Sequence, residues 1–152
     1  MNKVNIAVIG AGWWACYNHI PALKKNNSVG RIVVVDKQKE RLAVIKEKLN
    51  VAATYTSVDE MLDAELINGA IVATPHTAHY APAVKCIKKG VNILIEKPMT
   101  TTVEDARNLV ALAKSHSAEV MVACGWNYTS YMLEAHEKIK EGKIGKIKHV
   151  VA

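Results

Sequence analysis

The glycine-rich stretch near the start of the chain is the first feature whose residue types and spacing could carry chemistry. It follows a short apolar run and has the G-x-G-x-x-A pattern Gly10-Ala11-Gly12-Trp13-Trp14-Ala15. Between a strand and a helix, Gly10 allows a tight turn, Gly12 lets the backbone approach a pyrophosphate, and Ala15 permits close packing of the helix. The stretch therefore predicts a nucleotide-binding loop. A turn without a ligand, or the similar loop of S-adenosylmethionine-dependent methyltransferases, would show the same pattern.

Two tryptophans inside this loop are bulky for a phosphate-binding segment. Trp13 and Trp14 could shield a cofactor or contact another domain. The alternative is that one ring packs against the protein and the other is exposed.

An acidic residue lies about 20 residues beyond the glycine loop, at the end of the next apolar run. There, the carboxylate of Asp36 could accept hydrogen bonds from the hydroxyls of an adenosine ribose, which favours NAD. Asp36 could instead cap the following helix. The nearby cations Lys37 and Arg41 could bind a 2′-phosphate, so NADP stays an alternative; otherwise they lie on a solvated helix face.

Two tripeptides follow later apolar runs, namely Thr74-Pro75-His76 and Glu96-Lys97-Pro98. Ligands of open α/β sheets bind outside the carboxyl ends of the strands, so both tripeptides should face the same crevice as the glycine loop. A lysine there could donate a proton to an alkoxide, or a hydrogen bond to a carbonyl, during hydride transfer. An ordinary exposed lysine at a strand end is the alternative for Lys97.

Continuous apolar runs alternate with helical patterns along the chain, which predicts an α/β domain with a parallel sheet buried on both faces. We expect Pro21 to divide the residues from Trp13 to Lys25 into two short helices. Gly90 should cap one helix, and Thr101 with Glu104 should open another. The expected strands are 6–9, 32–35, 52–55, 70–73, 93–95 and 120–123, and the expected helices contain Leu42, Ile45 and Leu49; Tyr80, Val84 and Ile87; and Ala106, Leu109, Val110 and Ala113.

The pattern changes after Ala123. A helix is expected over 129–141, ending at Gly142, and an apolar run over 147–152 predicts a further strand. No strand follows the run over 147–152 to pair with its backbone groups, so we expect residues 126–152 to be a connecting helix and the first strand of an absent α+β substrate domain. Residues 1–125 would then form a dinucleotide-binding domain.

Composition excludes several classes of protein. Half of the 152 residues are hydrophobic and 22% are charged, which is typical of a globular domain, and no apolar run is long enough to span a membrane. The net charge of +6 comes from scattered cations, so a nucleic-acid partner is disfavoured. The three cysteines are widely spaced and His76 with His79 has no third ligand, so we expect no metal. A cytoplasmic protein is expected, since no signal peptide begins the chain.

Taken together, these motifs resemble the Gfo/Idh/MocA oxidoreductase family over essentially the whole chain. The most specific part is Glu96-Lys97-Pro98 after a conforming glycine loop, which argues against a methyltransferase. The other matching segments are His19-Ile20-Pro21-Ala22-Leu23, Thr74-Pro75 with His79, Gly90-Val91-Asn92-Ile93-Leu94-Ile95 and Gly142-Lys143-Ile144-Gly145-Lys146-Ile147.

The resemblance implies a Rossmann-type, doubly wound sheet of strand order 3-2-1-4-5-6 that binds NAD, or NADP, in a dehydrogenase of sugars, inositols or related polyols. Lys97 resembles the family's active-site lysine. The implied cofactor-binding residues are Gly10, Gly12, Trp13, Trp14, Ala15, Asp36, Lys37, Arg41, Thr74, Pro75, His76, His79, Glu96, Lys97, Pro98 and Asn127.

The resemblance also sets limits. The family's second domain usually supplies an Asp and His acid/base pair and most substrate contacts, so this chain should bind cofactor better than it catalyses. A homo-oligomer would form through that domain. Tyr128, Thr129 and Ser130 replace basic residues that often follow the first domain, which leaves the substrate open. A non-catalytic nicotinamide-binding sensor or subunit is the alternative function.

Overall fold

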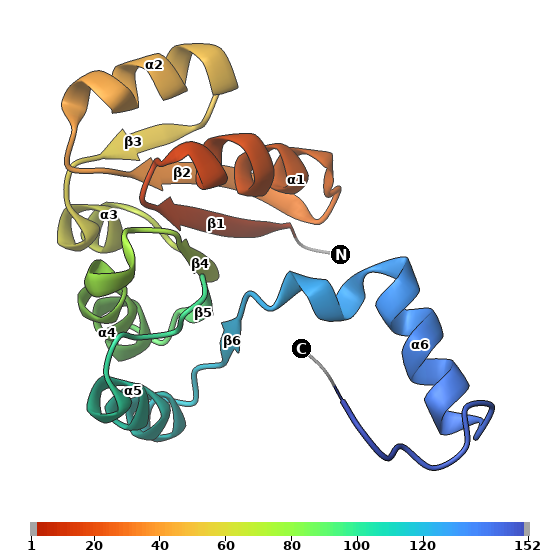
Figure 1. Cartoon of the computed structure of the whole chain (residues 1–152). Coiled ribbons are helices and arrows are strands. Elements are labelled where there is room, and N and C mark those ends of the chain that lie inside the picture. The colour runs from red at the N-terminus through yellow and green to blue at the C-terminus, as the bar shows by residue number, and fades with distance from the viewer. Residues whose placement is uncertain (1–2, 151–152) are drawn as a thin grey trace.

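Short runs rich in Val, Ile and Ala form the strands of one parallel sheet in the computed structural model, which describes residues 3–150. The strand order is β3-β2-β1-β4-β5-β6, and every pairing is parallel, as the sequence predicted (Figure 1). Because β1 pairs with both β2 and β4, the chain changes direction across the sheet there, and the carboxyl ends of β1 and β4 border a crevice. The strands are β1 (Val4–Ile9), β2 (Val29–Val35), β3 (Ala53–Tyr55), β4 (Gly69–Val72), β5 (Asn92–Ile95) and β6 (Val120–Val122).

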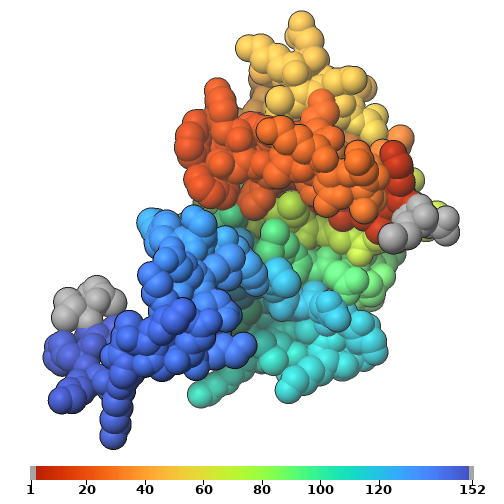
Figure 2. All heavy atoms as spheres, turned by 90° about the vertical axis from the view of Figure 1, so that its right-hand side faces the viewer, coloured from red at the N-terminus to blue at the C-terminus, as the bar shows by residue number. Residues whose placement is uncertain are grey.

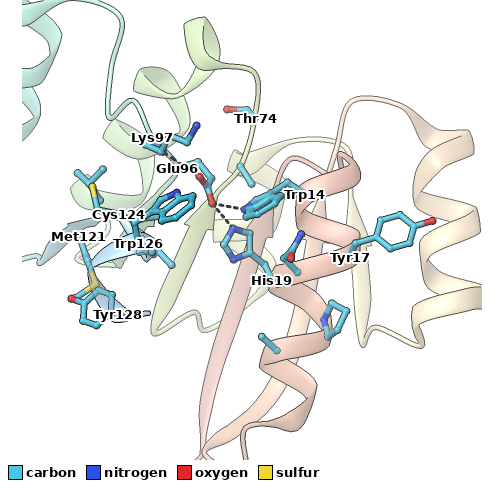
Figure 3. Close-up of a pocket in the computed structure, with 18 of the residues that line it drawn as sticks. Trp14, Tyr17, His19, Thr74, Glu96, Lys97, Met121, Cys124, Trp126 and Tyr128 are labelled. Carbon is cyan, nitrogen blue, oxygen red and sulfur yellow. Dashed lines mark hydrogen bonds and ion pairs between the residues drawn. The ribbon is translucent and has the colours of Figure 1, made fainter. Parts of the chain in front are cut away.

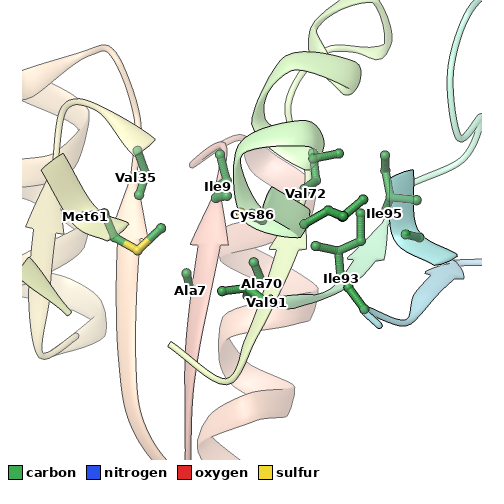
Figure 4. Packing of buried hydrophobic residues seen from close by; sticks show 14 of the residues in the cluster. Ala7, Ile9, Val35, Met61, Ala70, Val72, Cys86, Val91, Ile93 and Ile95 are labelled. Atoms are coloured by element: carbon green, nitrogen blue, oxygen red, sulfur yellow. The ribbon is translucent and has the colours of Figure 1, made fainter. Parts of the chain in front are cut away.

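Helices cover both faces of the sheet. Ala7 and Ile9 of β1 point to one face, where they share a core with α3, α4 and α5 (Figure 4). Val8 points to the other face, in a core with η1, α1 and α2. The helical segments are η1 (Ala15–His19), α1 (Ile20–Lys25), α2 (Lys39–Leu49), α3 (Val58–Ala64), η2 (His76–Ala78), α4 (Tyr80–Lys88), α5 (Val103–Ser115), η3 (Gly125–Tyr128) and α6 (Ser130–Lys140).

Burial is uneven between the two sides of the sheet. Ile95 of β5 and Leu109 of α5 are fully buried, and each such side chain stabilises the fold by about 1.5–3 kcal/mol relative to exposure. Met121 of β6, by contrast, is 59% exposed. The sheet near β6 therefore leaves apolar surface open beside the crevice.

The helix after the glycine loop differs from the expected pair of helices. The backbone stays helical from Trp13 to Lys25 through a π-helical turn, η1, in which the N–H of Ile20 donates to the carbonyl of Ala15. Pro21 lies in the first turn of α1, where a missing N–H is tolerated. The expected second helix with Pro21 near its start is thus confirmed, whereas the expected break before it is absent, because the wider π turn carries the helical backbone into the proline.

The other helix boundaries mostly match the sequence. Gly90 follows α4 with a φ of 72°, as a left-handed cap requires. The cap of α5 is Thr102, whose hydroxyl accepts the N–H of Asp105, so the expected cap at Thr101 was one residue early. Asp36 does not cap α2, because Gln38 occupies that position.

The last part of the chain stands apart from the core. Figure 2 shows α6 and the residues after it projecting from one side, and residues 131–150 are exposed throughout. Helix α6 confirms the helix expected over 129–141. Residues 147–150 form no strand, because no other strand of residues 3–150 lies alongside to pair with them, and residues 151–152 of the expected strand lie outside the described residues. The division of the chain at residue 125 stays a prediction.

Candidate functional site

A cavity of about 970 Å³ lies between the glycine-loop helix and the carboxyl ends of the later strands (Figure 3). One wall comes from η1 and α1, including Trp14 and His19, and the opposite wall comes from β6 and η3, including Trp126. Thr74, Glu96 and Lys97 lie at the strand ends between them. The sequence predicted this meeting of strand ends, and the structure adds the aromatic walls.

The carboxylate of Glu96 is the main polar junction of the cavity. Its Oε1 accepts hydrogen bonds from Trp14 Nε1 and His19 Nε2, both at 2.8 Å. Its Oε2 accepts the backbone N–H of Lys97 at 3.2 Å. An ionised carboxylate can only accept, so Nε2 of His19 carries the hydrogen in this arrangement. Glu96 therefore joins the glycine-loop helix to the turn after β5.

Lys97 lies in this turn with its side chain exposed to the cavity. Its ammonium group forms no ion pair with a carboxylate of residues 3–150. The peptide bond to Pro98 is cis. An ammonium group with free hydrogens at a cavity wall can donate to an oxygen of a bound ligand.

The tripeptide after β4 forms a tight turn at the mouth of the cavity. The hydroxyl of Thr74 donates to the carbonyl of Ala78 at 3.0 Å, and the N–H of Ala78 donates to the carbonyl of Pro75 at 2.7 Å. Thr74 and His76 line the cavity as expected, whereas Pro75 is exposed beside it.

His79 is placed differently from the sequence expectation of a direct cofactor contact. The side chain is fully buried, with Nδ1 2.8 Å from the carbonyl of Pro98 and Nε2 2.8 Å from the carbonyl of Thr74. Both ring nitrogens therefore face backbone carbonyls inside the protein, and the ring does not reach the cavity. His79 links the turn after β4 to the turn that carries Lys97.

The glycine loop fits a nucleotide phosphate. Gly10 has a φ of 95°, and a Cβ there would lie 2.6 Å from the carbonyl oxygen of Ala73, so only glycine fits the turn. A Cβ on Gly12 would meet no atom within 4 Å, so the protein leaves open space in front of that backbone. Ala15 is fully buried against the sheet, as predicted. The loop thus presents backbone and a helix N-terminus to a ligand.

The tryptophans of the loop take different places. Trp13 is 67% exposed and outside the cavity, with its ring centroid 5.8 Å from that of Trp14. Trp14 is 48% exposed and forms part of the cavity wall. Neither tryptophan is buried in the core: Trp14 faces the cavity, and Trp13 is largely exposed beside it.

Asp36 is already engaged with the protein. Its Oδ2 accepts the N–H of Ala11 at 2.9 Å and lies 3.3 Å from Nη1 of Arg41, and its Oδ1 accepts the N–H of Gln38 at 2.9 Å. This places the carboxylate at the end of β2 directly beside the glycine loop. Lys37 is exposed next to it.

Two predicted cofactor-binding residues lie outside the cavity, and two residues that line it were not predicted. Pro98 and Asn127 do not line the cavity; Pro98 contributes its carbonyl to His79, and Asn127 is exposed in η3. Sequence reasoning missed His19 as a site residue, because its contact with Glu96 depends on the π turn. Cys124, also missed, lines the cavity. Only its place after an expected strand end could have pointed to it.

The remaining titratable groups give no second reactive centre. Burial raises the pKa of the Cys86 thiol to about 12, so this cysteine stays protonated and unreactive. Burial also raises the pKa of Cys16.

No three His, Cys, Asp or Glu side chains of residues 3–150 gather as a set of metal ligands. Nor is any helix in that range both long and apolar enough to cross a bilayer.

Comparisons with known proteins agree with this geometry. The family model for Gfo/Idh/MocA, described as an oxidoreductase family with an NAD-binding Rossmann fold, matches residues 4–124. The chain is 28% identical over 148 residues to the D-xylose 1-dehydrogenase (NADP(+)) of Haloarcula marismortui, covering 95% of this chain and 41% of that protein. It is 29% identical over 147 residues to the 2,7-anhydro-N-acetylneuraminate hydratase of Mediterraneibacter gnavus, covering 97% of this chain and 38% of that protein.

A crystal structure of myo-inositol 2-dehydrogenase from Lactobacillus plantarum has the same fold. The TM-score is 0.89 at 24% identity, and the match covers 96% of this chain and 43% of that chain. The chain thus spans well under half of the length of each of these relatives.

Replacing His79 by leucine should lower the free energy of unfolding by about 1–3 kcal/mol, because the carbonyl of Thr74 or Pro98 that accepts the single N–H of the neutral ring loses its donor. Urea denaturation measures the change. His76→Leu is the matched control, since His76 is exposed and three positions earlier. Equal stability of His79→Leu and the unchanged chain would contradict the linking role of His79.

Proposed function

Because the chain belongs to the Gfo/Idh/MocA oxidoreductase family and forms its NAD(P)-binding domain, we propose that it serves an enzyme transferring hydride between a nicotinamide and a sugar, inositol or related polyol. The observation that carries the proposal is Lys97, which has no ion pair among residues 3–150, at a cavity beside the glycine loop. The names of the relatives, one a xylose dehydrogenase and one an inositol dehydrogenase, support this substrate class.

The residues at the carboxyl end of the sheet fit the two halves of a dinucleotide. The open space at Gly12 and the N-terminus of the glycine-loop helix would receive the pyrophosphate. Asp36 would accept the ribose hydroxyls of the adenosine half, on the β2 side of the loop. The nicotinamide half would enter the cavity past Trp14 and Thr74. When bound, the nicotinamide supplies a hydride acceptor or donor.

Lys97 then has the proton-handling role. Its ammonium group would donate a hydrogen bond to the substrate oxygen and stabilise the negative charge that develops there. Burial of Glu96 between Trp14 and His19 keeps that carboxylate occupied, so Lys97 rather than Glu96 is free to meet the substrate. Further acid/base groups and most substrate contacts would come from outside these residues.

The hydrogen bonds and the ion pair of Asp36 support NAD as the preferred cofactor. The side chain of Asp36 is 11% exposed, and a carboxylate beside the ribose of a bound dinucleotide would repel a 2′-phosphate. Arg41, which could bind that phosphate, is instead paired with Asp36. NADP binding would require Arg41 to leave this pair.

Titration of the chain with NADH and NADPH in parallel, followed by quenching of tryptophan fluorescence, tests the proposal. We expect saturable binding with NADH preferred.

Gly12→Ala should weaken NADH binding about tenfold or more with little loss of stability, because its Cβ fills the ligand space and touches no protein atom. Failure of the folded chain to bind either dinucleotide would overturn the proposal.

Asp36→Asn should move the preference toward NADPH, by about tenfold in the ratio of the two dissociation constants. The carboxamide oxygen still accepts from the N–H of Ala11, whereas the negative charge that pairs with Arg41 is gone. Lys46→Ala, on the exposed side of α2, is the control for a general change of charge nearby, and we expect it to leave the ratio within about twofold. An unchanged ratio in Asp36→Asn would argue against the carboxylate as the selecting group.

Lys97→Ala, in a polypeptide where a substrate domain follows this one, should reduce turnover by about a hundredfold or more and leave NADH affinity nearly unchanged. Steady-state rates with NAD and a panel of sugars and inositols, read from NADH absorbance, give the comparison. Full turnover in the variant would remove Lys97 from the reaction. Cofactor binding without turnover on any member of the panel, by the unchanged polypeptide, would favour a sensor or non-catalytic subunit.

A further inference from the structure

The π-helical turn after the glycine loop places two side chains on the same face of the helix. In an α-helix of 3.6 residues per turn, residues five apart point about 140° away from each other. In a π turn, the N–H of one residue bonds to the carbonyl five residues earlier, as Ile20 bonds to Ala15. The extra residue in the turn brings side chains five positions apart to the same side of the helix. Trp14 and His19 are five residues apart and both face the end of β5.

Both side chains reach one oxygen atom. Trp14 Nε1 and His19 Nε2 each lie 2.8 Å from Oε1 of Glu96, as the dashed lines in Figure 3 show. The side chains of His19 and Glu96 are only 14% and 15% exposed. Hydrogen bonds to an ionised acceptor that is shielded from water are stronger than those at an open surface. These contacts join segments 77 and 82 residues apart in the chain.

The second carboxylate oxygen continues the connection to the reacting lysine. Oε2 of Glu96 accepts the backbone N–H of Lys97. A displacement of Trp14 or His19 would therefore move Glu96 and, through it, the backbone from which Lys97 extends. Trp14 is 48% exposed, so packing holds its indole only in part, and the hydrogen bond to Glu96 adds a directional contact.

We propose that Trp14 and His19 are positioning residues: through Glu96 they hold the turn of Lys97 against the glycine-loop helix, and the π turn makes this double contact possible. The proposal rests on the proposed function for its consequence, namely that the contact shapes the nicotinamide side of the site. Gly12 and Asp36, on the adenosine side, take no part in it.

Nuclear magnetic resonance tests the contact without any cofactor. In ¹H–¹⁵N spectra recorded at one pH, His19→Leu should shift both the indole signal of Trp14 and the amide signal of Lys97, since all three groups bond to one carboxylate. His116→Gln, on the exposed end of α5, is the control variant and should leave both signals in place. An unchanged amide signal of Lys97 in His19→Leu would overturn the proposal.

Binding of NADH and of ADP-ribose, which lacks the nicotinamide, tests the consequence. His19→Leu should weaken NADH about tenfold while ADP-ribose stays within about twofold, and His19→Gln, whose carboxamide can still donate to Glu96, should recover most of the loss. Equal losses for both ligands, or no loss for either, would contradict a role on the nicotinamide side. If the unchanged chain bound neither ligand, the proposed function would fail, and the spectra would still decide whether the contact exists.

Discussion

The pairing of β1 with both β2 and β4 is the constraint on which the rest of the site depends. It places the end of β1 between Asp36 on one side and Thr74 on the other. The chain must then turn at Gly10, where a side chain would collide with the carbonyl of Ala73. Because this turn is so tight, the following helix starts directly above the strand ends, and its N-terminus faces the position where an anion would bind.

Polar contacts of long range then decide how the lysine turn is held. Glu96 attaches the turn to the glycine-loop helix, and His79 attaches the carbonyl of Pro98 to the turn after β4. Lys97 lies between these two attachments and has no ion pair within the described chain. The neighbours of the lysine are thus held in place, while its ammonium group is free of ion pairs among these residues. Under the proposed function, this would preorganise the site around Lys97.

The two ends of the site have different character. At β2, the carboxylate of Asp36 is bonded to backbone and paired with Arg41, which suits recognition of a small polar group such as a ribose. At β5 and β6, aromatic and apolar side chains surround a wider cavity that remains open on the side of α6. Figure 1 shows that α6 lies away from the strands of the sheet. Under the proposed function, the adenosine half would have its polar partners within this chain, whereas a substrate would need walls from beyond the described residues.

The sequence by itself determined the strands and the glycine loop, since continuous apolar runs and a G-x-G-x-x-A spacing are local signals, whereas the strand order followed from the resemblance to a family. It also placed Lys97 at a strand end facing the crevice. Only the tertiary structure decided that His79 is buried between two carbonyls, that Asp36 binds Ala11 rather than capping a helix, and that a π turn replaces a break at Pro21. The physical reason is distance along the chain: His19 and Trp14 find Glu96 only after the sheet has brought β1 and β5 within reach. No periodicity within a short window of sequence carries that information.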